Sequence, residues 1–281
     1  MRIPAPSRDL TADLDIAIMR RSEKTTRLLT AARAEILSSY GAYYETVADA
    51  TGKLSIAEGN KDLATALKGS YSLLDVGRPL RDLRSHLFSL TAPSHYRCPF
   101  CARAKVATLD HFLPKGKFPE YAVMAVNLVP VCERCNLLKG EELDTVDGIL
   151  LFHAFLESFP DVAILKADVA VGQTVSVTYR IEKPTFLDAT TYARVVKQFT
   201  VLDLLEYYKA EAISEMADQV ETYTVMGETL GKEGLKSLLE SLAVAPGTVN
   251  VNHWKAVLFR ALSLSDEFLD GGYKRLVAVM Q

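Results

Sequence analysis

Apolar positions in the first third of the chain recur with the spacing of a helix. Between Asp9 and Thr51, leucine, isoleucine and alanine return at steps of three and four residues, which is the period of an amphipathic helix. A second helical pattern runs from Asp62 to Leu74. A shorter one covers residues 80–88, after the helix-breaking sequence Gly77-Arg78-Pro79. We therefore expect residues 1–93 to form a helical N-terminal region.

The C-terminal part of the chain combines a strand pattern with further helical patterns. Residues 161–182 are rich in valine, and apolar residues alternate with polar ones from Val175 to Ile181. This period of two predicts a β-hairpin that turns at Gly172-Gln173 and buries one face. From Thr185 onward the helical period returns and continues towards the end of the sequence. Together these patterns predict a mainly helical α+β fold.

All four cysteines lie between these two parts, as the Cys-x-x-Cys pairs Cys98/Cys101 and Cys132/Cys135. Two such pairs can supply the four thiolates of a closed tetrahedral site, so we expect a structural zinc ion. The alternatives are two disulfides or four free core thiols. The N-terminal sequence lacks the apolar stretch of a signal peptide. We therefore expect a cytoplasmic protein, and that setting disfavours disulfides.

The residues between the two pairs carry the candidate chemistry. Asp110 and His111 end a short β-like run, Asn127 opens the run NLVPVC, and Asn136 directly follows the last cysteine. Carboxylate and amide oxygens suit Mg²⁺, which takes its remaining ligands from water and substrate phosphates. A histidine beside such an ion can accept the proton of an attacking water molecule. A zinc ion would hold Cys135 rigidly and position the neighbouring Asn136 with it.

These segments resemble the HNH endonuclease family, the ββα-metal nucleases. The matching pieces are LDHFLPK, NLVPVC and CNLLKG, framed by the two cysteine pairs, and they are similar to the zinc-bearing branch with an Asp-His, Asn, Asn motif. The resemblance implies that His111 is the general base. It also implies that Asp110 and Asn136 bind a catalytic Mg²⁺ or Mn²⁺ ion. By the same resemblance, Asn127 orients the hairpin and the histidine, and Lys139 faces phosphate.

Charge is unevenly distributed along the chain, whose net charge is −3. Residues 1–93 carry a net charge of +2 and residues 94–140 of +4, whereas residues 141–281 carry −9. The positive charge therefore lies where a phosphate would bind. The acidic C-terminal half is expected to pack or to dock a protein. No run of 18 apolar residues occurs, so we expect no membrane span.

We predict three regions: an N-terminal helical region (1–93), an HNH ββα-metal nuclease core with the four-cysteine zinc site (94–150), and a β-hairpin followed by a C-terminal helical region (151–281). Outside the motif, His153 lies in the apolar segment Gly148–Pro160. Two interpretations of His153 remain open. It is either a core histidine with satisfied hydrogen bonds or a residue that reaches the metal ion or phosphate.

The predicted function is metal-dependent hydrolysis of phosphodiester bonds in nucleic acid, most simply DNA. The resemblance further implies a role in bacterial antiphage defence with a partner protein such as an ATPase, which the acidic half would contact. One alternative is a sequence-specific endonuclease of the restriction or homing type. Others are a zinc-stabilised nucleic-acid-binding module without activity and an interaction protein that works through its acidic half.

Overall fold

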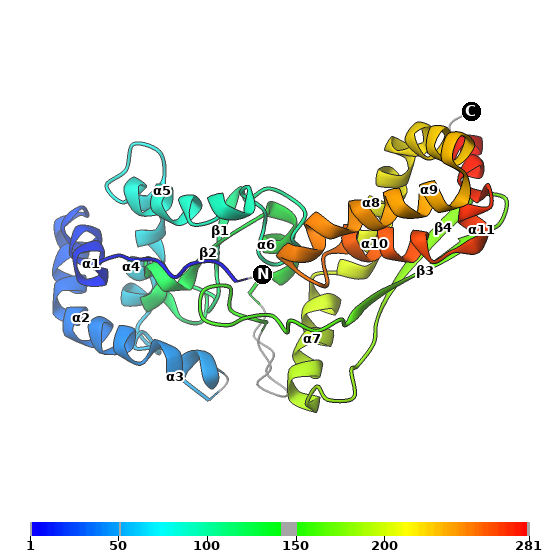
Figure 1. Cartoon of the computed structure of the whole chain (residues 1–281). Coiled ribbons are helices and arrows are strands. Elements are labelled where there is room, and N and C mark those ends of the chain that lie inside the picture. Colours follow the sequence, from blue (N-terminus) through cyan, green and yellow to red (C-terminus); the bar gives the residue numbers. More distant parts are fainter. Residues whose placement is uncertain (1, 51, 142–150, 280–281) are drawn as a thin grey trace. The chain divides into compact units, whose positions relative to one another are not determined.

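A computed structural model describes residues 2–50, 52–141 and 151–279 of the 281-residue chain. The chain divides into two compact units, Met1–Phe159 and Pro160–Gln281, and each has its own helices and its own two-stranded sheet (Figure 1). The three-region division expected from the sequence stays a prediction, and its boundary at residue 150 lies outside the described residues. Within the described residues, no helix combines the length and hydropathy that a membrane crossing requires.

The first unit begins with helices, as the apolar pattern predicts. The side chains of Asp9, Ser22 and Asn60 accept hydrogen bonds from backbone N–H groups in the first turns of three of them. Such caps satisfy donors that have no partner within the helix. The helices are α1 (Leu10–Met19), α2 (Glu23–Gly41), α3 (Tyr43–Ala48), α4 (Lys61–Gly69) and α5 (Arg81–Ser89).

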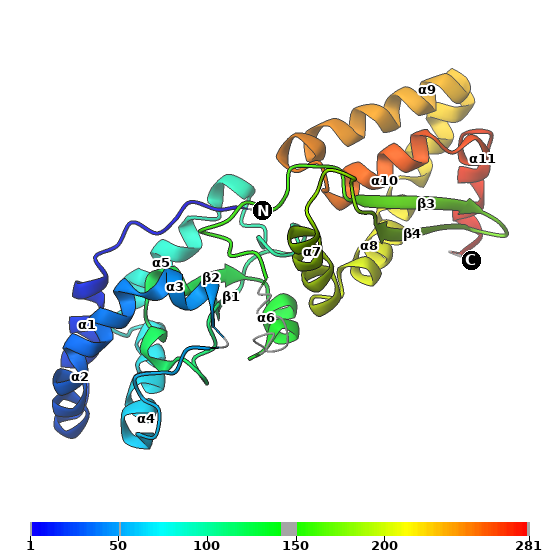
Figure 2. The same cartoon turned by 90° about the horizontal axis from the view of Figure 1, so that it is seen from below.

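A short sheet and one helix follow these N-terminal helices. Strand β1 (Thr108–His111) pairs antiparallel with β2 (Leu128–Val131), with Asp110 opposite Val129. Helix α6 (Glu133–Lys139) comes directly after β2, and contacts β1. In Figures 1 and 2 the hairpin lies between α6 and the N-terminal helices. The order of this region is therefore strand, strand, helix.

The apolar faces of the N-terminal helices pack against the connection between β1 and β2. Leu29 and Ile36 of α2 and Leu67 of α4 share one buried cluster with Phe118 and Tyr121 of that connection. Burying each such side chain contributes about 1.5–3 kcal/mol. The helical region thus holds the connection that leads from His111 to Asn127.

The second unit contains the predicted β-hairpin. Strand β3 (Leu165–Val171) pairs antiparallel with β4 (Val175–Ile181), and Gly172 N–H bonds to Thr174 O at the turn. Val175, Val177 and Tyr179 are buried, whereas the residues between them are exposed. The predicted alternation is therefore confirmed. The buried face packs against helices. One contact of this kind is the hydrogen bond that the Tyr179 hydroxyl donates to Trp254 O (3.0 Å).

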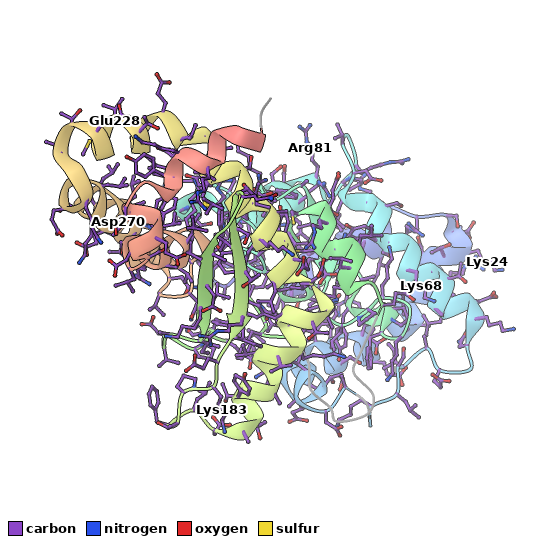
Figure 3. All side chains as sticks on the ribbon, turned by 90° about the vertical axis from the view of Figure 1, so that its right-hand side faces the viewer. Lys24, Lys68, Arg81, Lys183, Glu228 and Asp270 are labelled. Atoms are coloured by element: carbon purple, nitrogen blue, oxygen red, sulfur yellow. The ribbon has the colours of Figure 1, made fainter. Side chains whose placement is uncertain are left out.

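Helices form the rest of the second unit, and ion pairs lie on their surface. Lys274 pairs with Glu228 (3.0 Å), and Lys232 pairs with Asp270 (3.0 Å); both acidic residues lie at the surface (Figure 3). The helical elements are α7 (Ala189–Val201), α8 (Leu204–Asp218), α9 (Val220–Val249), α10 (Trp254–Ser263), α11 (Asp266–Leu269) and the 3₁₀ helix η5 (Gly272–Val279). The expected mainly helical α+β fold is confirmed.

Candidate functional site

The four cysteines converge on one point. Their Sγ atoms all lie within 4.8 Å of one another, and all four are buried free thiols rather than disulfides. In a tetrahedral site with Zn–S bonds of about 2.3 Å, sulfur atoms are about 3.8 Å apart. The Sγ atoms of Cys101 and Cys132 are 3.9 Å apart. The cluster therefore has the composition and size that can bind a structural zinc ion.

Each cysteine pair lies in a turn that directs its two sulfurs inward. In the first pair, Cys98 N–H bonds to Ala104 O (2.8 Å) and Ala102 N–H bonds to Cys98 O (2.8 Å). In the second pair, Cys132 is the N-terminal cap of α6, and its sulfur accepts from Cys135 N–H (3.5 Å). An ion on these sulfurs would fix the start of α6 against the turn that precedes β1.

Asp110 is a buried carboxylate at the floor of the site. It is 2% exposed, and its Oδ2 atom has no hydrogen-bond donor among the described residues. Lys139 supplies the counter-charge, with its Nζ atom 3.1 Å from Oδ1 and 3.0 Å from Oδ2. Burial raises the pKa of Asp110, and Lys139 opposes that rise. The Lys139 ammonium is therefore the cationic group that compensates this buried carboxylate in the structure.

His111 is held in one orientation by the backbone. Its Nε2 atom lies 3.0 Å from Ala122 O. Because a carbonyl oxygen can only accept, Nε2 carries the proton, and Nδ1 keeps its lone pair. No described residue forms a hydrogen bond with Nδ1. Burial lowers the pKa of His111 to about 3, so the imidazole is neutral near pH 7.

Asn127 connects the two ends of the loop between β1 and the 3₁₀ turn before β2. It is fully buried, and its Oδ1 atom accepts from Leu113 N–H (2.8 Å) and the Tyr43 hydroxyl (2.9 Å). Its amide group donates to Leu113 O (3.1 Å) and Tyr121 O (3.3 Å). This side chain thus holds the loop that includes Tyr121 and leads into Ala122.

A pocket of about 290 Å³ brings together three of the five predicted active-site residues, and Asn127 and Lys139 do not line it. Asn136 lies on one wall, where its amide donates to Thr108 Oγ1 (3.2 Å). Asp110 and His111 of β1 also line the pocket. Its remaining lining residues are Tyr71, Thr108, Leu109, Pro114, Lys115, Gly140 and Glu141. Two adjacent residues of β1 and one residue of α6 therefore line one common pocket.

Lys139 does not lie where the resemblance led us to expect. The prediction has it facing phosphate, yet its side chain is only 4% exposed. Its ammonium donates to Asp110 and also to His111 O (2.9 Å). In this structure Lys139 therefore neutralises a buried carboxylate and braces the end of β1, because α6 delivers it beneath the strand.

Sequence reasoning missed the aromatic wall of the pocket. Tyr71 packs on His111 with ring centroids 4.5 Å apart, and its hydroxyl donates to Leu109 O (3.2 Å). Lys115 lies over the other part of this wall, with its ammonium 4.4 Å from the centroid of Tyr71. Tyr71 lies in a predicted helix, and no local pattern distinguishes it from a core aromatic residue.

His153 is a fully buried side chain next to this site rather than one that lines the pocket. Its Nε2 atom lies 3.1 Å from the Tyr43 hydroxyl, and its ring packs on Phe112 at 4.1 Å between centroids. Burial lowers its pKa to about 3. Of the two open interpretations, the core histidine with satisfied hydrogen bonds is the one that agrees with this placement.

Comparison with known proteins gives two similarities. The chain is 24% identical over 217 residues to Protein ea31 of Escherichia phage lambda, a match that covers 71% of each chain. It is 37% identical over 57 residues to Septu protein PtuB of Bacillus thuringiensis, which covers 18% of this chain and 22% of that protein. No family model matches, and no solved structure matches.

The two similarities differ in what they cover. Similarity to the phage lambda protein extends over most of both chains, whereas similarity to the Septu protein is confined to a short part of each. The chain is thus related in part to a Septu protein and more broadly to a phage protein. Independently of these similarities, the chain contains a buried four-cysteine cluster that can bind zinc.

Proposed function

We propose that this protein is a metal-dependent endonuclease of the HNH type that hydrolyses phosphodiester bonds, with DNA as its substrate. The observation that carries the proposal is the common pocket of Asp110, His111 and Asn136 beside the four-cysteine cluster. A purely nucleic-acid-binding module would have no need for a neutral histidine next to a buried carboxylate in one pocket.

His111 is the proposed general base. Because its Nε2–H group bonds to Ala122 O, the Nδ1 lone pair is the atom that accepts a proton from water. The low pKa keeps this nitrogen unprotonated before substrate binds. A phosphate anion placed in the pocket would stabilise the imidazolium and raise that pKa, which makes the ring a stronger base when it is needed.

Asp110 and Asn136 are the proposed ligands of a Mg²⁺ or Mn²⁺ ion. The Asp110 carboxylate lines the pocket while it is paired with Lys139 (3.0 Å), and the Asn136 amide donates through Nδ2, which leaves the Asn136 oxygen for a cation. A carboxylate and an amide oxygen form the kind of donor set that these ions prefer. When bound, the ion would supply positive charge to the scissile phosphate and the leaving oxygen.

Lys115 is the proposed phosphate contact in place of Lys139. It lines the pocket, and within the described part of the chain its ammonium has no carboxylate partner. Lys117 of the same loop instead donates to Ala50 O (3.2 Å). Contacts of this kind position a nucleic acid without reading its sequence. We therefore propose low sequence specificity, rather than an enzyme of the restriction or homing type.

The biological role that we propose is antiphage defence in the bacterial cytoplasm, in concert with a partner protein such as an ATPase. The similarity to Septu protein PtuB supports this role for part of the chain. The second unit, residues 160–281, contains 12 Lys/Arg and 16 Asp/Glu, and this net charge of −4 makes it a poor surface for DNA. It is therefore the part of the chain that we assign to a protein partner.

Plasmid cleavage by the purified full-length chain tests the proposed activity. We expect cutting by the wild type with Mg²⁺ or Mn²⁺, none with EDTA, and none by His111→Ala, while both proteins contain about one zinc per chain. Equal cutting by both proteins would refute His111 as the base. If the wild type fails to cut with either ion, alone or with candidate partners, the nuclease proposal is wrong.

A further inference from the structure

We infer that Tyr43 and His153, two residues outside the motif, are positioning residues that hold His111 in its Nε2–H tautomer through Asn127. The effect of this tautomer on catalysis rests on the nuclease function proposed above. The hydrogen-bond chain itself does not depend on that function. It joins helix α3, the turn before β2 and the segment after the cysteine region into one buried network.

The direction of each hydrogen bond follows from the first. The Nδ1 atom of His153 accepts from Phe155 N–H (3.2 Å), so the proton of the neutral ring is on Nε2. That Nε2–H group donates to the Tyr43 hydroxyl (3.1 Å). The Tyr43 hydroxyl is then free to donate its own proton to Asn127 Oδ1 (2.9 Å). The donor and the acceptor of each of these three hydrogen bonds are therefore fixed.

Asn127 connects this chain of hydrogen bonds to the loop that orients His111. With its oxygen occupied by donors, its amide must donate, and it does so to Leu113 O and Tyr121 O. The next residue after Tyr121 is Ala122, whose carbonyl oxygen accepts the His111 Nε2–H bond. The location of that oxygen decides which nitrogen of His111 is protonated.

His153 also contacts Phe112, the residue next to His111 in the sequence. The two rings pack with centroids 4.1 Å apart. Phe112 N–H in turn bonds to Asn127 O (2.9 Å). The network therefore holds His111 from its own backbone neighbour and from its hydrogen-bond acceptor.

Burial makes the network sensitive to the loss of one atom. Tyr43, Asn127 and His153 are each 0% exposed, so water does not replace a missing partner. Tyr43→Phe would remove the acceptor of His153 and one of the two donors to Asn127 Oδ1. The Asn127 side chain would then be held by three hydrogen bonds instead of four, and the position of Ala122 O would be less firmly fixed.

Tyr121→Phe is a matched control because it removes another buried tyrosine hydroxyl from the same core. That hydroxyl bonds to Ser39 O (3.1 Å) and Thr46 Oγ1 (3.3 Å), outside the chain that leads to His111. Both variants lose hydrogen bonds of similar kind, so we expect similar losses of thermal stability. Only Tyr43→Phe should change the state of His111.

The first measurement is the tautomer of His111 in the full-length protein, read from the ¹⁵N spectrum of the histidine side chains and assigned with His111→Gln. We expect protonated Nε2 and unprotonated Nδ1 in the wild type and in Tyr121→Phe. Tyr43→Phe and His153→Leu should show a mixture of both tautomers. His153→Gln, which keeps a donor near the Nε2 position, should restore the wild-type spectrum.

The second measurement is plasmid cleavage by the same variants. Tyr43→Phe and His153→Leu should lower kcat about tenfold to a hundredfold with KM unchanged, because the base is misplaced but substrate contacts remain. Tyr121→Phe and His153→Gln should stay within about twofold of the wild type. A wild type that does not cut would overturn the nuclease proposal and leave the tautomer result standing. If Tyr43→Phe matches Tyr121→Phe in both spectrum and kcat, the positioning inference is wrong.

Discussion

Lys139 and Asp110 form an ion pair that is almost completely removed from water. The Lys139 ammonium lies 3.0 Å from Asp110 Oδ2, and their side chains are 4% and 3% exposed. The pair joins the last residue of α6 to the third residue of β1. A proposed metal ligand is therefore already provided with a positive neighbour, which opposes the effect of burial on the carboxylate and holds it in place before any divalent ion binds.

Replacing Lys139 by methionine should destabilise the protein by about 3–5 kcal/mol, because it leaves a buried charge without a partner. Burial raises the pKa of Asp110 and Lys139 opposes that rise, so the pKa should increase further in the variant. At low pH the carboxyl group binds a proton, which removes the cost of burying an unpaired charge. The loss of stability should therefore be larger at pH 8 than at pH 5.5 in urea denaturation.

The double variant Lys139→Met with Asp110→Asn is the matched control for this experiment. It removes both charges together, so most of the lost stability should return and its pH dependence should disappear. An equal loss at both pH values in the single variant would show that the ammonium contributes packing rather than charge.

Zinc binding should depend on the four cysteines and on no nearby histidine. Cys132→Ser removes one of four converging sulfurs, so we expect the zinc content to fall from about one per chain to near zero and the melting temperature to drop strongly. His95 lies only three residues before Cys98 but is exposed. His95→Ala should therefore keep its zinc. Elemental analysis of the two variants decides between a site of four cysteines and a site that includes His95.

The buried histidines should make the protein less stable as the pH falls below about 6.5. Burial lowers the pKa of His153 to about 3, so between these values the unfolded chain binds a proton that the folded chain does not. One such residue costs about 2 kcal/mol at pH 5 relative to pH 7. In His153→Gln, the free energy of unfolding measured with urea should therefore fall less between pH 7 and pH 5 than it does in the wild type, by about 2 kcal/mol.

Comparison with the wild type at each pH removes the contribution of the cysteines, which both proteins share. His95→Gln is the control for the loss of a histidine, because this residue is exposed. If His153→Gln lost as much stability between pH 7 and pH 5 as the wild type, the buried imidazole would not be the source.

Two lysines of one loop offer a test of the phosphate contact. Lys115 lines the pocket, whereas Lys117 is tied to Ala50 O. Lys115→Ala should weaken DNA binding and reduce the slope of log K against log salt by about 0.9, the value for one lost phosphate contact. Lys117→Ala removes the same charge and should leave the slope nearly unchanged. Binding in EDTA separates this effect from cleavage, and equal slopes in the two variants would contradict the assignment.

The helical regions and the β-hairpin were predictable because periodicity is a local signal. The alternation from Val175 to Ile181 reports a strand with one buried face, and the structure confirms it. The pocket, in contrast, combines Asp110 of β1 with Asn136 of α6, and only the resemblance of their segments to a known motif suggested that they meet. The roles of these residues in catalysis stay predictions.

Residue type and spacing alone were sufficient to predict a cluster of four cysteines that can bind zinc. Two Cys-x-x-Cys pairs specify a four-sulfur cluster, because thiolates two residues apart can bind one ion whatever surrounds them. The burial of Lys139 and the contacts of Tyr43, Tyr71 and His153 were decided only by the tertiary structure. Their partners lie far away along the chain, and the packing of several segments determines whether a polar side chain meets solvent, an ion pair or a hydrogen bond.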